Sequence, residues 1–233
     1  MSIISLSGRA GVGKDEAASI IQKLTTPPRA IPKDNYKIYC QPTSPWIVKK
    51  WAGPLRKVSA ILLNMDEKYL YTREFKENTL PPEWDYYTAC CEMELDAYVT
   101  PDLKCSNCGD PATRHQMTGR YFLQHAGTNA IRNGLHPDAW VNALMGGYKA
   151  NVDEAYPSWI ISDTRFPNEL QDVKDRDGIS IRINRGNSSS EGLHHSETAL
   201  DDAEFDWVID NNGPIEHLEG SLRAILLAEG ILK

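Results

Sequence analysis

The chain has 233 residues, 41% of them hydrophobic and 24% charged, which is typical of a globular protein with one α/β domain and an insertion. Its formal net charge of −7 argues against generic electrostatic binding to DNA, so we expect no nucleic-acid polymer as a partner. No apolar run approaches the length of a membrane span, and no signal-peptide pattern precedes the first predicted strand. These features predict a cytoplasmic protein that does not bind membranes.

The first elements predict a phosphate-binding site. Ile3–Leu6 is a short apolar run suited to a buried strand, and the apolar residues Ala17, Ile20, Ile21 and Leu24 follow at helical spacing. Between them lies a G-x-x-x-x-G-K loop, whose glycines let backbone N–H groups approach an anion while the helix start and the lysine add positive charge. The loop consists of Gly8, Arg9, Ala10, Gly11, Val12, Gly13, Lys14 and Asp15.

Asp15 departs from the usual form of this motif, in which Ser or Thr follows the lysine. A carboxylate cannot donate a hydrogen bond, and it repels phosphate unless a cation or a proton intervenes. We therefore expect Asp15 to face Mg²⁺ or the acceptor of the reaction.

The middle of the chain is less regular. Residues 36–40 could form a second strand, and Leu55, Val58, Leu62 and Met65 mark a helix that is entered through Gly53-Pro54. Residues 79–118 show weak periodicity and carry two cysteine pairs, so we expect an inserted lobe at about 66–118.

Regular elements resume after the lobe and alternate between helix and strand. This alternation predicts a three-layer α/β fold, in which a mostly parallel sheet has helices on both faces. The predicted elements are helices over 119–133 and 137–149, a strand over 158–162, a helix from Pro167 to Gly178, a strand over 179–183, a lid-like loop over 185–198, a strand over 207–209 and a helix over 215–225.

Charged residues near the predicted strand end at 162 are candidates for catalysis. Asp163 directly follows a buried strand, where a nucleotide-binding sheet places an acid that can hold Mg²⁺, and Arg165 could contact a phosphate. Phosphoryl transfer requires further cations, although most single candidates will be solvated surface residues. These candidates are Arg9, Arg56, Lys57, Arg73, Arg120, Arg132, Arg182 and Arg185.

A second candidate site lies in the inserted lobe. Cys105, Cys108 and Gly109 form a C-x-x-C-G turn, whose two thiolates can grip one Zn²⁺ ion. We predict a structural zinc site in which Cys90 and His115 complete the ligands, with Cys91 as the alternative to Cys90. The competing interpretation is a set of reduced thiols in a loop.

Taken in order, the motifs resemble those of the bacteriophage deoxynucleoside monophosphate kinases almost from end to end. No motif after the first is very specific, but their order and spacing are. They are S-G-x-x-x-x-G-K-D at 7–15, A-G-P-L-R-K at 52–57, T-R-E-F at 72–75, R-x-x-L-Q-x-x-G-T at 120–128 followed by Trp140, D-T-R-F-P-N-E at 163–169, R-x-N-R at 182–185, His194–Glu197 and D-x-V-I-x-N-x-G at 206–213.

The resemblance implies a P-loop kinase fold with an inserted lobe that binds the acceptor nucleotide. It implies transfer of the γ-phosphoryl group of ATP, with Mg²⁺, to deoxynucleoside monophosphates, which would supply DNA precursors for phage replication in the host cytoplasm. It also suggests a homodimer. The implied catalytic residues are Lys14, Asp15, Asp163 and Arg165, the acceptor-binding residues are Lys57, Arg73, Arg120, Gln124, Thr128 and Arg132, and the lid residue is Arg185.

Two alternatives remain at this point. One is another P-loop kinase that acts on a small phosphorylated metabolite, because some of these also carry G-K-D. The other is a non-catalytic nucleotide-binding module. A GTPase is disfavoured because the sequence contains no N-K-x-D motif.

Overall fold

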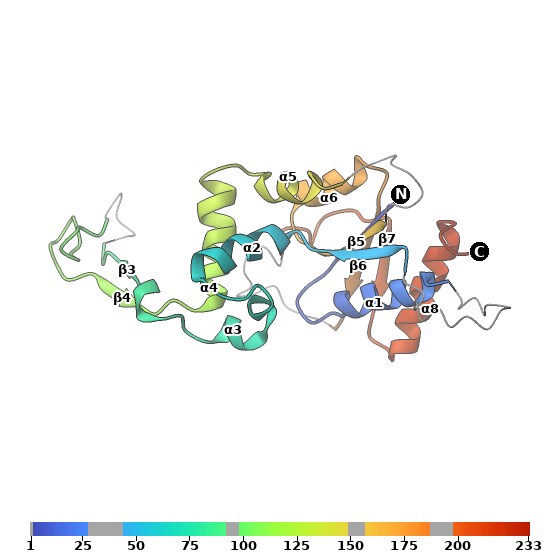
Figure 1. Cartoon of the computed structure of the whole chain (residues 1–233), viewed down its shortest axis with the longest axis horizontal. Helices are drawn as coiled ribbons and strands as arrows, with labels where there is room; N and C mark the ends of the chain where they lie inside the picture. Colours follow the sequence, from blue (N-terminus) through green and yellow to red (C-terminus); the bar gives the residue numbers. More distant parts are fainter. Residues whose placement is uncertain (1, 28–43, 92–97, 149–156, 187–197) are drawn as a thin grey trace, which may run out of the picture. The chain divides into compact units, whose positions relative to one another are not determined.

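The chain folds into two compact units. Unit 1 comprises Met1–Gly53 and Trp140–Lys233, and unit 2 comprises Pro54–Ala139. The computed structural model describes residues 2–27, 44–91, 98–148, 157–186 and 198–233 (Figure 1). Within these ranges, every helix is too short or too polar to span a lipid bilayer.

A five-stranded sheet forms the centre of unit 1, in the order β2-β5-β1-β6-β7. All neighbouring strands are parallel, so the connections between them must cross over a face of the sheet. The strands are β1 (Ile3–Ser7), β2 (Trp46–Lys49), β5 (Ser158–Thr164), β6 (Ile179–Asn184) and β7 (Trp207–Asp210). The central position of β1 buries it on both faces and places the loop that follows it at the middle of one sheet edge.

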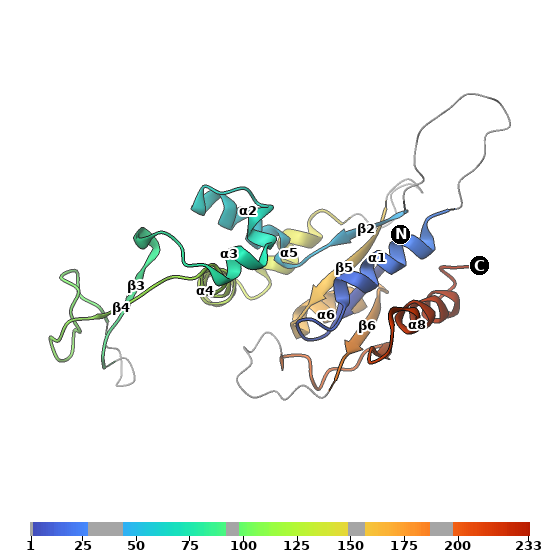
Figure 2. The same cartoon turned by 90° about the horizontal axis from the view of Figure 1, so that it is seen from below.

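Successive side chains of β1 enter two different cores because a strand alternates its side chains between the two faces. Ile4 and Leu6 join a core that includes residues of α1 (Lys14–Thr25) and α8 (Ile215–Ala228). Ile3 joins a core that includes residues of α5 (Ala139–Met145) and α6 (Pro167–Lys174). Figure 2 shows α1 beside α8 along the strands. This arrangement confirms the predicted α/β fold with a mostly parallel sheet.

Unit 2 has its own apolar core, which includes Leu70, Phe75 and Phe122. Thr72 and Thr118 cap the two helices that contribute Phe75 and Phe122, since their hydroxyls accept the backbone N–H of Phe75 at 3.1 Å and of Tyr121 at 3.2 Å. The elements are α2 (Ala52–Leu63, which begins in unit 1), η1 (Tyr69–Tyr71), α3 (Arg73–Glu77), η2 (Pro82–Trp84), the antiparallel strands β3 (Tyr86–Thr88) and β4 (Thr113–His115), α4 (Gly119–Gln124) and the π-helix η3 (His125–Asn133).

Several element boundaries differ from the sequence-based prediction. Strand β5 ends at Thr164, so Asp163 lies inside the strand instead of after it. The helix predicted over 119–133 exists but changes from α to π at His125. Strand β2 was not predicted, and the strand predicted over 36–40 lies outside the described residues.

The helix predicted from Leu55 to Met65 is confirmed as α2, but only part of its apolar stripe is packed. Val58 and Leu62 are 43% and 56% exposed, whereas Ser59 and Leu63 are buried. Leu55 packs against the π-helix. Its side chain lies so close to Gly127 that a Cβ added there would be 2.8 Å away. Glycine at 127 therefore allows α2 and η3 to approach closely.

Gly119 tests the packing of unit 2, because a Cβ at this position would overlap the backbone carbonyl of Phe75. We expect Gly119→Ala to lower the free energy of unfolding by about 2 kcal/mol, in the range of overpacked core substitutions. Gly220→Ala in α8 is the matched control, because nothing lies within 4 Å of its added Cβ. There we expect a gain of about 0.5–1 kcal/mol from helix propensity. Denaturant titration of both variants measures the difference, and equal stabilities would contradict the prediction.

Candidate active site

The loop between β1 and α1 adopts the backbone that a phosphate-binding loop requires. Gly8, Gly11 and Gly13 have φ values of 145°, 78° and 102°, which favour glycine. A Cβ on Gly8 would overlap the carbonyl oxygen of Ile183, and a Cβ on Gly13 would lie 2.9 Å from Asn211 Nδ2. The glycines thus permit both the turn and its close approach to β6 and to the residue after β7.

Lys14 lies where the loop meets the helix. It is the first residue of α1, and its Nζ donates to the carbonyl oxygens of Gly8 and Arg9 at 2.6 and 2.7 Å. The loop therefore wraps around the ammonium group at the positive end of the helix dipole. Backbone N–H groups, a helix start and a lysine together form an anion site of the kind that binds nucleotide phosphates.

Asn211, which is far from this loop in sequence, fixes its position. Its side chain is 8% exposed, and its Nδ2 donates to the carbonyl oxygen of Val12 at 2.8 Å. The contact holds the loop against the residue that follows β7. The sequence contained a signal for this role, because Asn211 is the asparagine of the motif at 206–213, but no contact between it and the loop could be read from the sequence.

Asp15 contacts two side chains that the sequence did not link to it. Lys50 Nζ donates to its Oδ1 at 2.8 Å, and Ser162 Oγ donates to the same atom at 3.1 Å. Partial burial alone would raise the pKa of Asp15, but the hydrogen bond and charge of Lys50, with Ser162 and Lys14, lower it below its usual value. The carboxylate is therefore ionised at neutral pH, and it remains accessible because 76% of the side chain is exposed.

Asp163 caps the start of α2. Its Oδ1 accepts the backbone N–H of Trp51 at 2.7 Å, and its Oδ2 accepts that of Ala52 at 3.2 Å. Asp163 thereby joins β5 to the segment that follows β2, and Trp51 Nε1 adds a buried hydrogen bond of 3.0 Å to Thr164 Oγ1. Both oxygens of the predicted catalytic acid are thus engaged by backbone amides.

Glu169 is a second carboxylate of the D-T-R-F-P-N-E motif that accepts hydrogen bonds from backbone N–H groups. It is 2% exposed, and its Oε2 accepts the N–H groups of Arg165 and Phe166 at 2.9 and 3.1 Å, which caps the N-terminus of α6. These two bonds to Glu169 therefore fix the conformation of the turn that carries Arg165. The side chain of Arg165 lies half-buried at the end of β5.

Asp201 bridges two arginines beside the phosphate-binding loop. Its Oδ2 pairs with Arg9 at 2.8 Å and its Oδ1 with Arg182 at 2.7 Å, and Arg182 also donates to Ser7 Oγ at 3.1 Å. Arg9 belongs to the loop and Ser7 ends β1. The bridge therefore fixes two of the predicted cations near the loop, and Asp201 was missed because nothing in the sequence pattern marks it.

The predicted acceptor residues all lie in unit 2 but differ in exposure. Arg73 forms an exposed i,i+4 pair with Glu77 at 2.7 Å. Arg120 and Lys57 are exposed, whereas Gln124 and Thr128 are half-buried on α4 and η3. Arg132, at the end of η3, donates to the carbonyl oxygen of Pro137 at 3.3 Å.

Two polar side chains on α2 stand out among the described residues. Arg56 Nε and Nη1 and Ser59 Oγ are buried without a hydrogen-bond partner in the described part of the chain. The Arg56 guanidinium lies 4.3 Å from the centre of the Tyr71 ring. Residues three apart share one helix face, so these donors lie together. Sequence reasoning included Arg56 among the cations but favoured Lys57, and it overlooked Ser59.

Comparison with known proteins identifies the family. The family model described as deoxynucleotide monophosphate kinase matches residues 105–222, half of the chain. The chain belongs to this family. It is 27% identical over 227 residues to a protein of Acanthamoeba polyphaga mimivirus that is provisionally named as such a kinase, covering 93% of this chain and 91% of the relative. It is also 27% identical over 111 residues to the deoxynucleotide monophosphate kinase of enterobacteria phage T4, covering 48% and 46%.

Family membership makes the chain a nucleotide kinase and bears out the resemblance drawn from the ordered motifs. The range matched by the deoxynucleotide monophosphate kinase model includes Asp163, Glu169, Asp201 and Asn211. The phosphate-binding loop precedes that range. The alignment with the mimivirus relative is longer and covers 93% of this chain.

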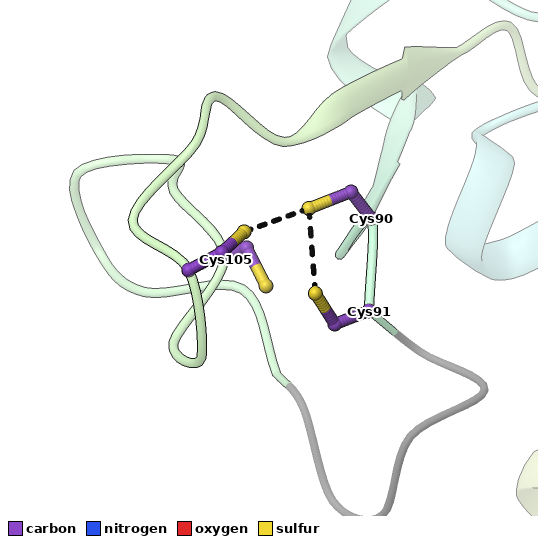
Figure 3. A group of neighbouring side chains, drawn as sticks. Cys90, Cys91 and Cys105 are labelled. Carbon is purple, nitrogen blue, oxygen red and sulfur yellow. Dashed lines mark hydrogen bonds between the residues drawn. The ribbon is translucent and has the colours of Figure 1, made fainter.

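Unit 2 brings together four cysteines, Cys90, Cys91, Cys105 and Cys108. Figure 3 labels the first three. Backbone N–H groups of Cys108 and Asn107 lower the pKa of the Cys105 thiol to about 6, which favours its thiolate form. His115, the fourth predicted metal ligand, lies outside this group. Its Nε2 is 2.9 Å from Thr88 Oγ1, and its ring stacks on Tyr86.

The predicted lid is only partly described. Arg185 is exposed directly after β6, and Gly186 donates its N–H to Asn212 Oδ1 at 2.6 Å. Residues 187–197, which include the motif at His194–Glu197, lie outside the described residues.

Proposed function

We propose that this enzyme transfers the γ-phosphoryl group of ATP to deoxynucleoside monophosphates. The observation that carries the proposal is the phosphate-binding loop wrapped around Lys14 at the end of the central strand, in a chain that belongs to the deoxynucleotide monophosphate kinase family. The viral and phage sources of the two relatives support a role in supplying DNA precursors during viral replication. The alternative acceptor, another phosphorylated metabolite, has no comparable support.

On the donor side, Lys14 and the loop amides bind the phosphates of ATP, and the oxygens near the loop suit Mg²⁺. Asp15 is ionised and accessible, and Ser162 Oγ lies 3.1 Å from it, which gives a hard cation two oxygen donors. Mg²⁺ would neutralise charge on the transferring phosphoryl group. Asp163 supports this arrangement as a positioning residue, because its oxygens bind backbone amides, and Arg165 contributes charge near the end of β5.

On the acceptor side, unit 2 binds the monophosphate, and Arg56 and Ser59 of α2 contact its phosphate group. Buried donors without partners are rare in native proteins and carry an energetic cost. A phosphate offers acceptor oxygens, which the described residues do not supply to these donors, and arginine binds phosphate through two parallel N–H bonds. Gln124, Thr128 and Arg132 on or beside the π-helix complete the site, since π-helices occur frequently at functional sites. Arg73 and Arg120 supply exposed charge around it.

The proposed reaction is tested by a coupled assay that follows ADP release from ATP with a panel of ribo- and deoxynucleoside monophosphates. We expect at least one deoxynucleoside monophosphate to stimulate ADP release, with the phosphorylated nucleotide as product. Lys14→Met is the control that removes the donor-side charge, and it should abolish stimulation. Stimulation only by a phosphorylated sugar or metabolite would favour the alternative kinase, and no stimulation by any acceptor would favour a binding module.

Asp15 is tested by its two nearest replacements, Asp15→Asn and Asp15→Ser. If the carboxylate helps to hold Mg²⁺, the amide should lower kcat by about tenfold, equivalent to about 1.4 kcal/mol in the barrier, and should raise the Mg²⁺ concentration needed for half-maximal rate. Serine, the residue usual in this motif, should retain more activity than asparagine. Turnover and Mg²⁺ dependence near the wild-type values in both variants would remove Asp15 from the mechanism.

The acceptor site is tested on adjacent residues of α2, the half-buried Arg56 and the exposed Lys57. Loss of a charge-assisted hydrogen bond costs about 1.5–3 kcal/mol, so Arg56→Ala should raise the KM for the monophosphate by roughly 10- to 150-fold and leave that for ATP nearly unchanged. The KM of Arg56→Lys for the monophosphate should lie between the values of the wild type and Arg56→Ala. Lysine keeps the positive charge but lacks the planar guanidinium group that can form two parallel hydrogen bonds. A larger effect of Lys57→Ala would assign the phosphate contact to Lys57 instead.

A further inference from the structure

In the described part of the segment between β3 and β4, few apolar side chains are buried. The two strands that enclose it have three residues each, and an isolated two-stranded hairpin is at best marginally stable in water. Among residues 98–112, all of which the structure describes, Cys105 is the single fully buried residue, while Tyr98 and Leu103 are 65% and 45% exposed. Another source of stability is therefore needed here.

The four cysteine sulfurs have the spacing of a tetrahedral metal site. All four atoms lie within 4.8 Å of one another, with Cys90 and Cys91 separated by 3.8 Å and Cys90 and Cys108 by 3.0 Å. Zn²⁺ bound to four thiolates at about 2.3 Å places the sulfurs about 3.8 Å apart. Small side-chain movements would bring all four to that geometry, and Figure 3 shows the sulfurs of Cys90, Cys91 and Cys105 directed toward one another.

The backbone explains how neighbouring cysteines can face the same point. Cys90 and Cys91 lie in a turn after β3, so their side chains do not alternate as they would in a strand. Cys105 and Cys108 lie in the C-x-x-C turn, which is closed by a 2.9 Å bond from Gly109 N–H to the Cys105 carbonyl, with Gly109 at φ 76°. The antiparallel pairing of β3 with β4 brings the two turns together.

We propose that Cys90, Cys91, Cys105 and Cys108 bind one structural Zn²⁺ ion that holds the β3–β4 segment together. Four thiolates fill the tetrahedral shell and leave no open position, which is typical of a structural site and not of a catalytic one. His115 is not a ligand, because its ring bonds Thr88 and stacks on Tyr86.

The zinc site also secures the contact between the hairpin and α4. Tyr86 of β3 stacks on Tyr121 of α4 with ring centres 4.7 Å apart and planes 4° from parallel. The ion fixes the turn that directly follows β3 and therefore limits the positions that Tyr86 can adopt. A metal bond at the far end of the hairpin thus stabilises packing at its base.

The metal content of the full-length protein, purified without chelator and measured by elemental mass spectrometry, tests the ligand set. We expect about one equivalent of zinc per chain and less than about a tenth in each of the four Cys→Ser variants. His115→Ala and Cys40→Ser are the controls and should keep the full equivalent. Zinc below a tenth in the wild type, iron in its place, retention in the cysteine variants or loss in His115→Ala would each overturn the proposal.

Limited trypsin digestion of the wild-type protein tests the structural role and avoids variants that fail to fold. Lys104 in the segment and Arg114 in β4 are exposed cleavage sites. A chelator should speed cleavage there by about tenfold or more, and Zn²⁺ but not Mg²⁺ should restore protection, because thiolates select the softer ion. Unchanged cleavage after complete zinc removal would refute the structural role. Neither measurement uses nucleotide, so failure of the kinase assignment would leave both readouts intact.

Discussion

The close approach of the phosphate-binding loop to the ends of two neighbouring strands is the constraint on which the proposed donor site depends. Gly8 packs against the carbonyl of Ile183, and Val12 accepts a bond from buried Asn211, so the loop is fixed by residues far from it in sequence. Any Cβ at position 8 would overlap the Ile183 carbonyl oxygen, so the first contact requires glycine. The parallel sheet makes both contacts possible, because it brings the carboxyl ends of β1, β6 and β7 to one edge.

Several carboxylates of the family motifs act on the backbone of the protein. Asp163 caps α2, Glu169 caps α6, and Asp206 binds the N–H and hydroxyl of Ser180 at 2.7 and 2.6 Å, which ties the start of β7 to β6. Each carboxylate accepts hydrogen bonds from donors near the end of a helix or strand that would otherwise lack an acceptor. Asp163 and Glu169 thus stabilise the edge of the sheet at which the phosphate-binding loop lies, whereas Asp206 acts at the opposite edge, where β6 and β7 begin.

The sequence predicted local features well and long-range contacts poorly. The strand, loop and helix at Ile3–Thr25 could be predicted because periodicity and the conformational freedom of glycine are local properties. The structure confirms the strand and the helix. The partnership of Asp15 with Lys50 was not predicted, because it requires the pairing of β2 with β5, and β2 itself was overlooked. The group of four cysteines was predicted in part. The C-x-x-C turn is local, whereas the position of His115 outside the group, and of both Cys90 and Cys91 inside it, depends on how the chain turns after β3.

The two units are stabilised by different physical means, and this difference bears on their roles. Unit 1 buries both faces of a five-stranded sheet, which suits the proposed donor site, because phosphates must be held there in one geometry. In unit 2, His115, Tyr86, Tyr121 and His125 form a run of stacked rings beside a small core, with the cysteine group beyond the hairpin. Aromatic stacking and a metal can order such a segment without a large apolar interior. In the proposed acceptor site, the buried donors of Arg56 would then be paired by the ligand and not by an extended core.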